Sequence, residues 1–173
     1  MKIKINTTKI SVLLTACFAI VLSFVSCSED EEVDTEKPII NVEYAKAFPS
    51  YCDTIYFGEA FNFKASYSDN VELGGYSIDI HNDFDHHIHA YKIEKCHLAP
   101  VKKPVNPFSK IEGYEIPTGV KEHEVNLSIS IPASNDSGQF DEGDYCFHIY
   151  LTDKEGWSTP FAVSIKMMHR TVQ

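Results

Sequence analysis

Strict alternation of apolar and polar residues constrains the fold of this chain more than any other feature of its sequence. Residues 61–68 (FNFKASYS) and 125–131 (VNLSISI) alternate without a break. This period of two places one face of a strand in the core and the other in water. Three further strands are predicted at residues 76–80, 145–151 and 161–167, and weaker ones at 39–44, 55–57 and 90–93. No segment of ten or more residues has a convincing helical period.

Seven or eight short strands separated by turn residues predict an all-β protein, an antiparallel β-sandwich. Two details favour an immunoglobulin-like topology. Residues 141–145 (DEGDY) resemble the approach to a tyrosine corner, in which Tyr145 bonds back to upstream backbone. Residues 153–157 (DKEGW) predict a tight turn that joins the last two strands as a hairpin.

The N-terminus has the layout of a secretory signal peptide. Three lysines precede an apolar stretch at residues 10–25, which is short for a membrane-spanning helix. The stretch runs through Ser26 into Cys27 and resembles a bacterial lipobox, in which the cysteine thiol is acylated and the chain is cut before it. We therefore expect a lipoprotein signal peptide at residues 1–26 and a membrane anchor at lipidated Cys27. The alternative is an ordinary signal peptide cut nearby, with Cys27 free.

An acidic segment follows the predicted anchor. Residues 28–32 (SEDEE) resemble the export signal of surface lipoproteins of the phylum Bacteroidota, and residues 27–36 also predict a solvated tether. The sandwich domain is then expected at residues 37–173. These features predict an outer-membrane lipoprotein that faces the outside of the cell or, alternatively, the periplasm. The formal net charge of −10 argues against a nucleic-acid partner.

Two cysteines and four prolines indicate how the longer loops are arranged. Cys52 and Cys96 lie in apparent loops and are favoured as a disulfide, whereas the alternative leaves them and Cys146 reduced. Four of the eight prolines fall within residues 95–120, and no strand is expected to run through them. So long an excursion is either functional, framing a binding site, or loosely ordered.

A histidine block at residues 81–89 (HNDFDHHIH) is the strongest indication of chemistry. Neutral imidazole is the commonest protein ligand for transition metals, and carboxylates can complete the shell. If the strand at residues 76–81 pairs with that at 144–151, Cys146 and His148 face the same side as His81 and form a floor under the block. A Cys146 thiolate would favour zinc or cuprous copper. The alternative is that Cys146 and His148 merely lie on an exposed sheet face, which is the favoured interpretation for Cys146. The candidate metal ligands are His81, His86, His87, His89, Asp79, Asp85, His148 and Cys146.

Other readings of the polar residues stay open. The histidines would be incidental in a solvated loop, and the block matches no standard zinc motif. Calcium is less favoured than zinc or copper, with candidates at Asp69 and Asn70 with Asp153 and Glu155, or along residues 135–144. No phosphate-binding glycine loop, Gly-x-Ser-x-Gly elbow or nucleophile beside a base occurs, so a non-catalytic protein is expected.

Several segments together resemble a known family. The leader, the acidic tether, and the runs at residues 34–40 (DTEKPII), 67–89 and 143–158 (GDYCFHIYLTDKEGWS) resemble the Bacteroidota lipoproteins that carry domain of unknown function 4625. The resemblance implies a lipidated, immunoglobulin-like surface or periplasmic protein and brings no activity or ligand. The leading hypothesis is a membrane-anchored module that binds zinc or copper. The rival is an adhesion or assembly module that binds a protein or a glycan.

Overall fold

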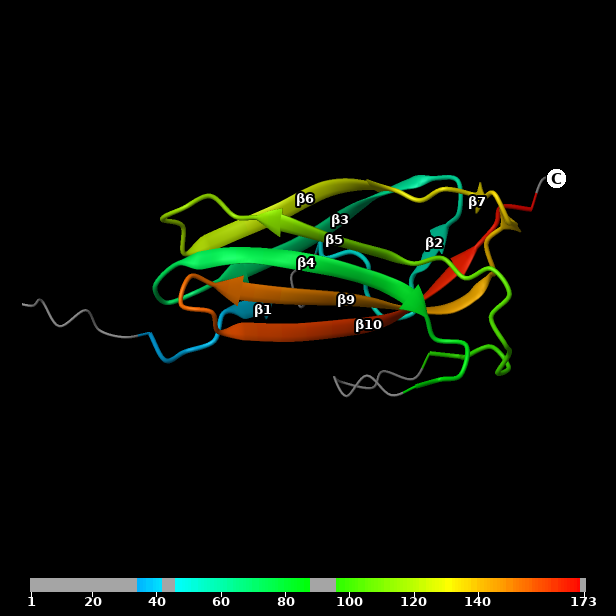
Figure 1. The fold of residues 1–173 in the computed structure, drawn as a ribbon. Helices are drawn as coiled ribbons and strands as arrows, with labels where there is room; N and C mark the ends of the chain where they lie inside the picture. Colours follow the sequence, from blue (N-terminus) through cyan, green and yellow to red (C-terminus); the bar gives the residue numbers. More distant parts are fainter. Residues whose placement is uncertain (1–33, 42–45, 88–95, 172–173) are drawn as a thin grey trace, which may run out of the picture. The chain divides into compact units, whose positions relative to one another are not determined.

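The computed structural model describes residues 34–41, 46–87 and 96–171. All regular elements in these residues are β-strands (Figure 1). The predicted all-β class is confirmed, and these residues include no helix that could cross a membrane. The strands are β1 (Ile39–Asn41), β2 (Thr54–Tyr56), β3 (Ala60–Ser68), β4 (Leu73–Asn82), β5 (Lys110–Glu115), β6 (Glu122–Ser130), β7 (Ser134–Asn135), β8 (Gly138–Gln139), β9 (Gly143–Asp153) and β10 (Ser158–Met168).

Three of these strands, β5, β7 and β8, are not among those predicted. None of the four prolines at residues 95–120 lies in a strand, as expected, but the segment between Pro107 and Pro117 forms β5, which was not predicted. It is an edge strand that pairs only with β4 and leaves most of its residues exposed, so it shows no alternation in its sequence. The predicted strand at residues 90–93 lies outside the described residues.

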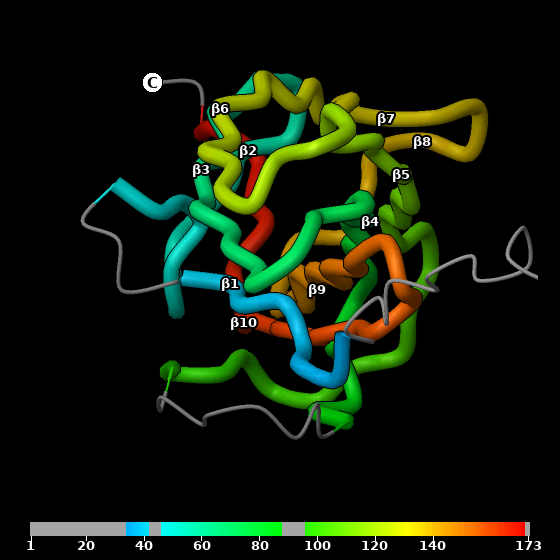
Figure 2. Tube along the Cα trace, turned by 90° about the vertical axis from the view of Figure 1, so that its left-hand side faces the viewer, coloured from blue at the N-terminus to red at the C-terminus, as the bar shows by residue number. Residues whose placement is uncertain are grey.

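The strands form two larger sheets and one small one. Strand order is β1-β3-β6 in the first, β2-β10-β9-β4-β5 in the second and β7-β8 in the third (Figures 1 and 2). Neighbouring strands are antiparallel except β2 and β10, which are parallel. Strand β9 lies at the centre of the five-stranded sheet, between β4 and β10, so its outer face is flanked by strands on both sides.

The core lies where the inner faces of the two larger sheets meet. The Phe63 ring of β3 lies 5.4 Å from the Phe147 ring of β9, and the Tyr67 ring lies 5.2 Å from that of Tyr76 in β4. These rings are at most 7% exposed, and they occupy the apolar positions of the alternating pattern. Burial of every second residue therefore explains why these segments form strands rather than helices.

Tyr145 makes the backbone hydrogen bond that its position predicts. Its hydroxyl donates to the carbonyl oxygen of Asp141 at 2.7 Å and accepts a bond from the amide of Phe108 at 3.1 Å. The residue is completely buried, and burial raises its pKa to about 12. The hydroxyl thus ties the proline-rich excursion to the start of β9.

A Tyr145→Phe variant is expected to lose about 1–3 kcal/mol of unfolding free energy, because the amide of Phe108 and the carbonyl of Asp141 each lose a buried partner. Urea unfolding measures the change. Tyr114→Phe is the matched control, since the Tyr114 hydroxyl donates to the exposed Glu112 carboxylate. Equal stability of the two variants would contradict the role of the corner.

The excursion is bonded to the domain at several points after Cys96. A disulfide joins Cys96 to Cys52, the pair favoured from the sequence. The amide of Ala99 donates to the Asp144 carboxylate at 2.6 Å, and the amide of Lys102 donates to the carbonyl of Phe84 at 3.1 Å. These contacts hold residues 96–102 against the ends of β4 and β9, and the segment passes outside β10 (Figure 2).

Candidate metal centre

The candidate site lies on the outer face of β4 and β9. Ile78, Ile80, Phe147 and Ile149 of these strands are at most 4% exposed and fill the core. The alternate residues therefore point away from it. In the antiparallel register Asp79 lies opposite His148, and His81 lies opposite Cys146. The structure thus brings these four predicted residues onto one patch of sheet.

Two groups of ligand atoms converge on this patch. His81, Cys146 and His148 each offer one such atom, and the three atoms lie within 4.8 Å of one another. Asp83, His87 and Cys146 form a second group by the same measure. The His81 ring centre lies 5.2 Å from that of His148 and 5.6 Å from that of His87. Cys146 belongs to both groups and is their common point.

Hydrogen bonds to one nitrogen orient each of the three rings. Nδ1 of His81 lies 3.0 Å from Oδ1 of Asp79, and Nδ1 of His148 lies 3.2 Å from the Tyr150 hydroxyl. Nδ1 of His87 lies 2.6 Å from Oδ1 of Asp85. Carboxylates at this position fix the ring tautomer in metal sites, with Nε2 as the ligand atom. Asp79 and Asp85 are thus placed to orient the rings, and neither belongs to the two groups of converging ligand atoms.

The exposed carboxylate of Asp85 and the buried thiol of Cys146 respond in opposite ways to their surroundings. The hydrogen bond to His87 lowers the pKa of Asp85. Burial, and then the negative charges of Asp83 and Asp79, raise the pKa of Cys146 to about 12. Cys146 is thus a protonated thiol at neutral pH, and a metal ion would bind it as thiolate and displace the proton.

Cys146 and His148 are buried, which corrects one expectation. The sequence favoured an exposed sheet face for Cys146, yet the two residues are only 4% and 5% exposed. The start of the excursion lies close to this part of the sheet. Sγ of Cys96 lies 3.9 Å from the carbonyl oxygen of Ser164, the residue that pairs with Cys146 in β10. Cys146 and His148 therefore lie in a largely desolvated environment, where interactions with an ion are stronger than in water.

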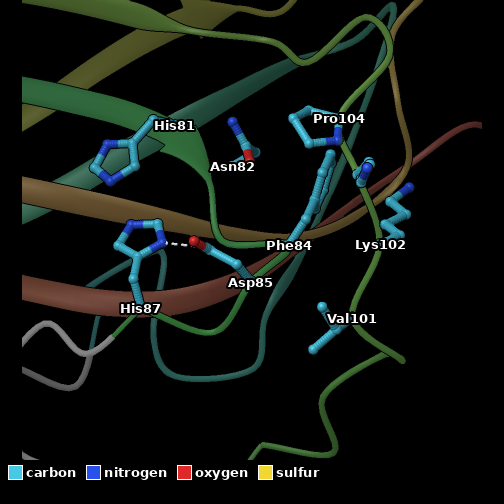
Figure 3. A pocket seen from close by; sticks show the side chains of 9 residues that line it. His81, Asn82, Phe84, Asp85, His87, Val101, Lys102 and Pro104 are labelled. Atoms are coloured by element: carbon cyan, nitrogen blue, oxygen red, sulfur yellow. Dashed lines mark hydrogen bonds and ion pairs between the residues drawn. The ribbon is translucent and has the colours of Figure 1, made fainter.

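An open hollow beside the cluster gives access from solvent (Figure 3). Its volume is about 560 Å³. His81 and His87 stand on one side, and the proline-rich excursion forms the other. The Lys102 ammonium lies 4.2 Å from the centre of the Phe84 ring and also donates to the carbonyl of Glu142. The lining residues are His81, Asn82, Phe84, Asp85, His87, Val101, Lys102, Lys103 and Pro104.

One predicted histidine ligand among the described residues, His86, does not join the cluster. His86 has a positive φ of 55°, and its Nε2 lies 3.7 Å from Oδ2 of Asp144. That carboxylate is itself ion-paired with Lys166 at 2.6 Å. His86 therefore faces a different part of the domain. His89 lies outside the described residues.

Two residues of the site were not predicted as members. Asp83 follows β4, and its amide donates to the carbonyl of Asp144, which extends the pairing of β4 and β9 by one residue and keeps Asp83 near Cys146. Tyr150 lies two residues after His148 on the same face of β9, so its alternation with His148 was the available signal.

The described part of the chain is thus an all-β domain that gathers nitrogen, sulfur and oxygen atoms on the outer face of one sheet. The chain matches the model of the family described as "Domain of unknown function (DUF4625)" over residues 25–168 and belongs to that family. The comparison with curated proteins gave no match. The family resemblance is thereby confirmed, whereas the Bacteroidota source and the lipid anchor stay predictions.

Proposed function

We propose that this protein is a membrane-anchored, non-catalytic surface lipoprotein whose immunoglobulin-like domain binds zinc or cuprous copper. His81, Cys146 and His148 would hold the ion, with His87 and Asp83 beside them. The observation that carries the proposal is the convergence of two imidazoles and one thiol from paired strands within 4.8 Å. Rigid strands position such donors more precisely than loops do.

The donor set favours particular ions. Thiolate and imidazole ligands suit zinc and cuprous copper, and a tetrahedral site needs four ligands. Three come from His81, Cys146 and His148, and the second group supplies candidates for the fourth in His87 and Asp83. The negative charges of Asp83 and Asp79 that hold Cys146 protonated would also attract a cation. Carboxylate and hydroxyl partners already orient the rings.

The anchor and the topology have separate support. The apolar leader and Cys27 support lipidation, and the acidic residues after Cys27 support export to the surface. The hairpin of β9 and β10, the pairing of β9 with β4, and the Tyr145 corner support an immunoglobulin-like arrangement. A lipidated chain would be held at the membrane by its acyl groups while the domain stays in water.

A second function, adhesion to a protein or a glycan, has one observation in its favour. Large apolar side chains are exposed on the excursion and on the edge strand β5: Val101 is 64% exposed, Val105 89% and Ile111 75%. Exposed apolar side chains and an uncovered strand edge are features of interaction surfaces. In this case the histidines would be incidental.

Zinc titration of the full-length protein tests the metal proposal. The wild type is expected to retain one zinc ion per chain after dialysis, and His81→Ala is expected to weaken binding by more than the roughly 10–100-fold that loss of an outer partner costs. His86→Ala is the matched control, because His86 faces Asp144 and belongs to neither group. Isothermal titration with zinc measures all three. A wild type that retains no zinc or copper would favour adhesion.

A further inference from the structure

We propose that a second cation site, selective for calcium, lies at the opposite end of β9 and is formed by Asp34, Asp69 and Asp153. Each carboxylate offers one oxygen, and the three oxygens lie within 4.8 Å of one another. Asp153 is five residues beyond His148 on β9, a distance of about 17 Å along a strand. The site is therefore separate from the histidine cluster.

The three carboxylates come from distant parts of the chain. Asp34 precedes β1, Asp69 follows β3, and Asp153 ends β9 at its hairpin with β10. Strands β3 and β9 both end at the same end of the domain, which is also where the described chain begins (Figure 1). The fold thus gathers three acidic residues that no local motif connects.

Each carboxylate is fixed through one oxygen only. Oδ1 of Asp69 accepts the amides of Val71 and Glu72 at 2.9 and 2.8 Å. Oδ1 of Asp153 accepts the amides of Gly156 and Trp157 at 2.7 and 2.8 Å. The carboxylates are thereby held in one orientation by the turns that follow them.

Asp34 is held in the same way. Its Oδ1 accepts the amide of Glu36 at 3.0 Å and the side-chain amide of Asn70 at 2.9 Å. The backbone hydrogen bond from Glu36, followed by that from Asn70, lowers the pKa of Asp34. The hydrogen bonds keep the Asp34 carboxylate in a fixed position beside the Asp69 turn.

The second oxygen of each carboxylate is the evidence for a ligand at this site. Oδ2 of Asp34, of Asp69 and of Asp153 is buried and has no hydrogen-bond partner in the described part of the chain. The three residues are only 4%, 9% and 4% exposed. Three neighbouring carboxylates, each with one buried and unpartnered oxygen, are unfavourable because these oxygens lose water and the negative charges repel one another. A cation bound between them would remove both costs.

No lysine or arginine of the described ranges takes the place of that cation. The nearby Lys154 ammonium lies 4.0 Å from Oε1 of Glu72, and the Lys121 ammonium donates to the carbonyl of Asn70 at 2.7 Å. Neither forms an ion pair with any of the three aspartates. The negative charge of the site is thus available to an ion from solution.

The donor atoms favour calcium over other ions. All three are carboxylate oxygens, the ligands of hard cations, whereas zinc and copper prefer nitrogen and sulfur. Oxygens bound to one calcium ion at about 2.4 Å lie within about 4.8 Å of one another, as these three do, and calcium tolerates irregular shells that magnesium does not. Bound calcium would pin the segment at Asp34, where the chain enters the domain, to the β3–β4 turn and the β9–β10 hairpin.

The single tryptophan of the chain provides a direct probe of this site. The Trp157 amide donates to Asp153, and the indole Nε1 donates to the carbonyl of Asp34 at 3.0 Å. Terbium replaces calcium in oxygen sites and emits when a nearby indole is excited. The full-length protein, freed of metal with a chelator, is expected to sensitise terbium emission on excitation of Trp157. Calcium should displace terbium, with a dissociation constant on the order of 10⁻⁴ to 10⁻³ M.

Asp153→Asn is the decisive variant, because asparagine keeps an acceptor oxygen for the turn amides and replaces the other oxygen with an amide nitrogen. It is expected to raise the calcium dissociation constant at least about tenfold. In chelator it should be at least as stable as the wild type to heat, since repulsion is reduced, whereas in calcium the wild type should be the more stable. Glu155→Gln is the matched control: the sequence made Glu155 a calcium candidate, but its side chain is exposed and does not belong to the cluster, so neither quantity should change.

The wild type alone can overturn the proposal if the variant fails to fold. Absence of sensitised terbium emission, together with an unchanged melting temperature up to about 10 mM calcium, would show that no calcium site exists. This test of calcium binding does not depend on the proposed transition-metal function. A Cys146→Ser variant should keep the terbium signal unchanged, and a wild type without zinc binding would leave the calcium site untouched.

Discussion

A Cys146→Ser variant is expected to bind zinc on the order of 1000-fold more weakly than the wild type, a loss of about 4 kcal/mol in binding free energy. Cys146 is the common member of both groups of ligand atoms and contributes their sulfur. A serine hydroxyl does not ionise at neutral pH and is a poor ligand for zinc or cuprous copper. The effect should therefore exceed that of removing one histidine, because the remaining imidazoles lose the donor that they share.

Cobalt provides a second readout for the same variant. Cobalt(II) occupies zinc sites, and a thiolate ligand adds a sulfur-to-metal absorption band in the near ultraviolet. The wild type should show this band and Cys146→Ser should lack it, while His86→Ala should keep it. Unfolding in chelator should be similar for the wild type and Cys146→Ser, because the exchange of sulfur for oxygen preserves the shape of the side chain. Wild-type zinc affinity in the serine variant would contradict the site.

The alternating pattern carried most of the information about the fold. In β3, for example, Phe63, Ala65 and Tyr67 are at most 3% exposed while their neighbours are partly solvated, so the burial pattern follows the sequence directly. Strand β5 could not be found in this way. Its sequence (KIEGYE) includes the exposed Ile111 and no fully buried residue, since an edge strand is held by backbone pairing on one side.

The candidate site could likewise be predicted only in part. The positions of Asp79, His81, Cys146 and His148 on one face could be predicted, because strand periodicity and antiparallel pairing determine both face and register. The direction of the His86 side chain could not be predicted, since the positive φ of His86 sends its ring toward Asp144. Local backbone conformation in a turn leaves no periodic trace in the sequence.

The acidic cluster shows a third limit of sequence reasoning. Asp69 and Asp153 could be named as calcium candidates because each begins a turn. Asp34 could not, because it lies in a segment that reads as a solvated tether. Only the tertiary structure shows that this segment bonds to Asn70 and Trp157 and so completes the group. Contacts across more than a hundred residues have no local signature.

Removal of the Cys52–Cys96 disulfide is expected to cost about 4 kcal/mol of unfolding free energy, the chain-entropy value for a loop of this length. The bridge spans 44 residues of sequence and ties the segment before β2 to the start of the proline-rich excursion. Without it the unfolded chain gains conformational freedom, while the folded domain keeps its other contacts. Urea unfolding of the Cys52→Ala/Cys96→Ala variant measures the loss.

Reduction gives this prediction an internal control. Dithiothreitol should lower the stability of the wild type to that of the double alanine variant and should leave the variant unchanged, because Cys146 forms no disulfide. The amide of Cys52 donates to the carbonyl of Ser164, and Sγ of Cys96 also lies beside that carbonyl, so the bridge sits against the strand that flanks Cys146. Loss of the bridge should therefore also weaken zinc binding, since the excursion that walls the hollow is then held by hydrogen bonds alone. A double variant as stable as the oxidised wild type would show that the remaining contacts of the excursion suffice.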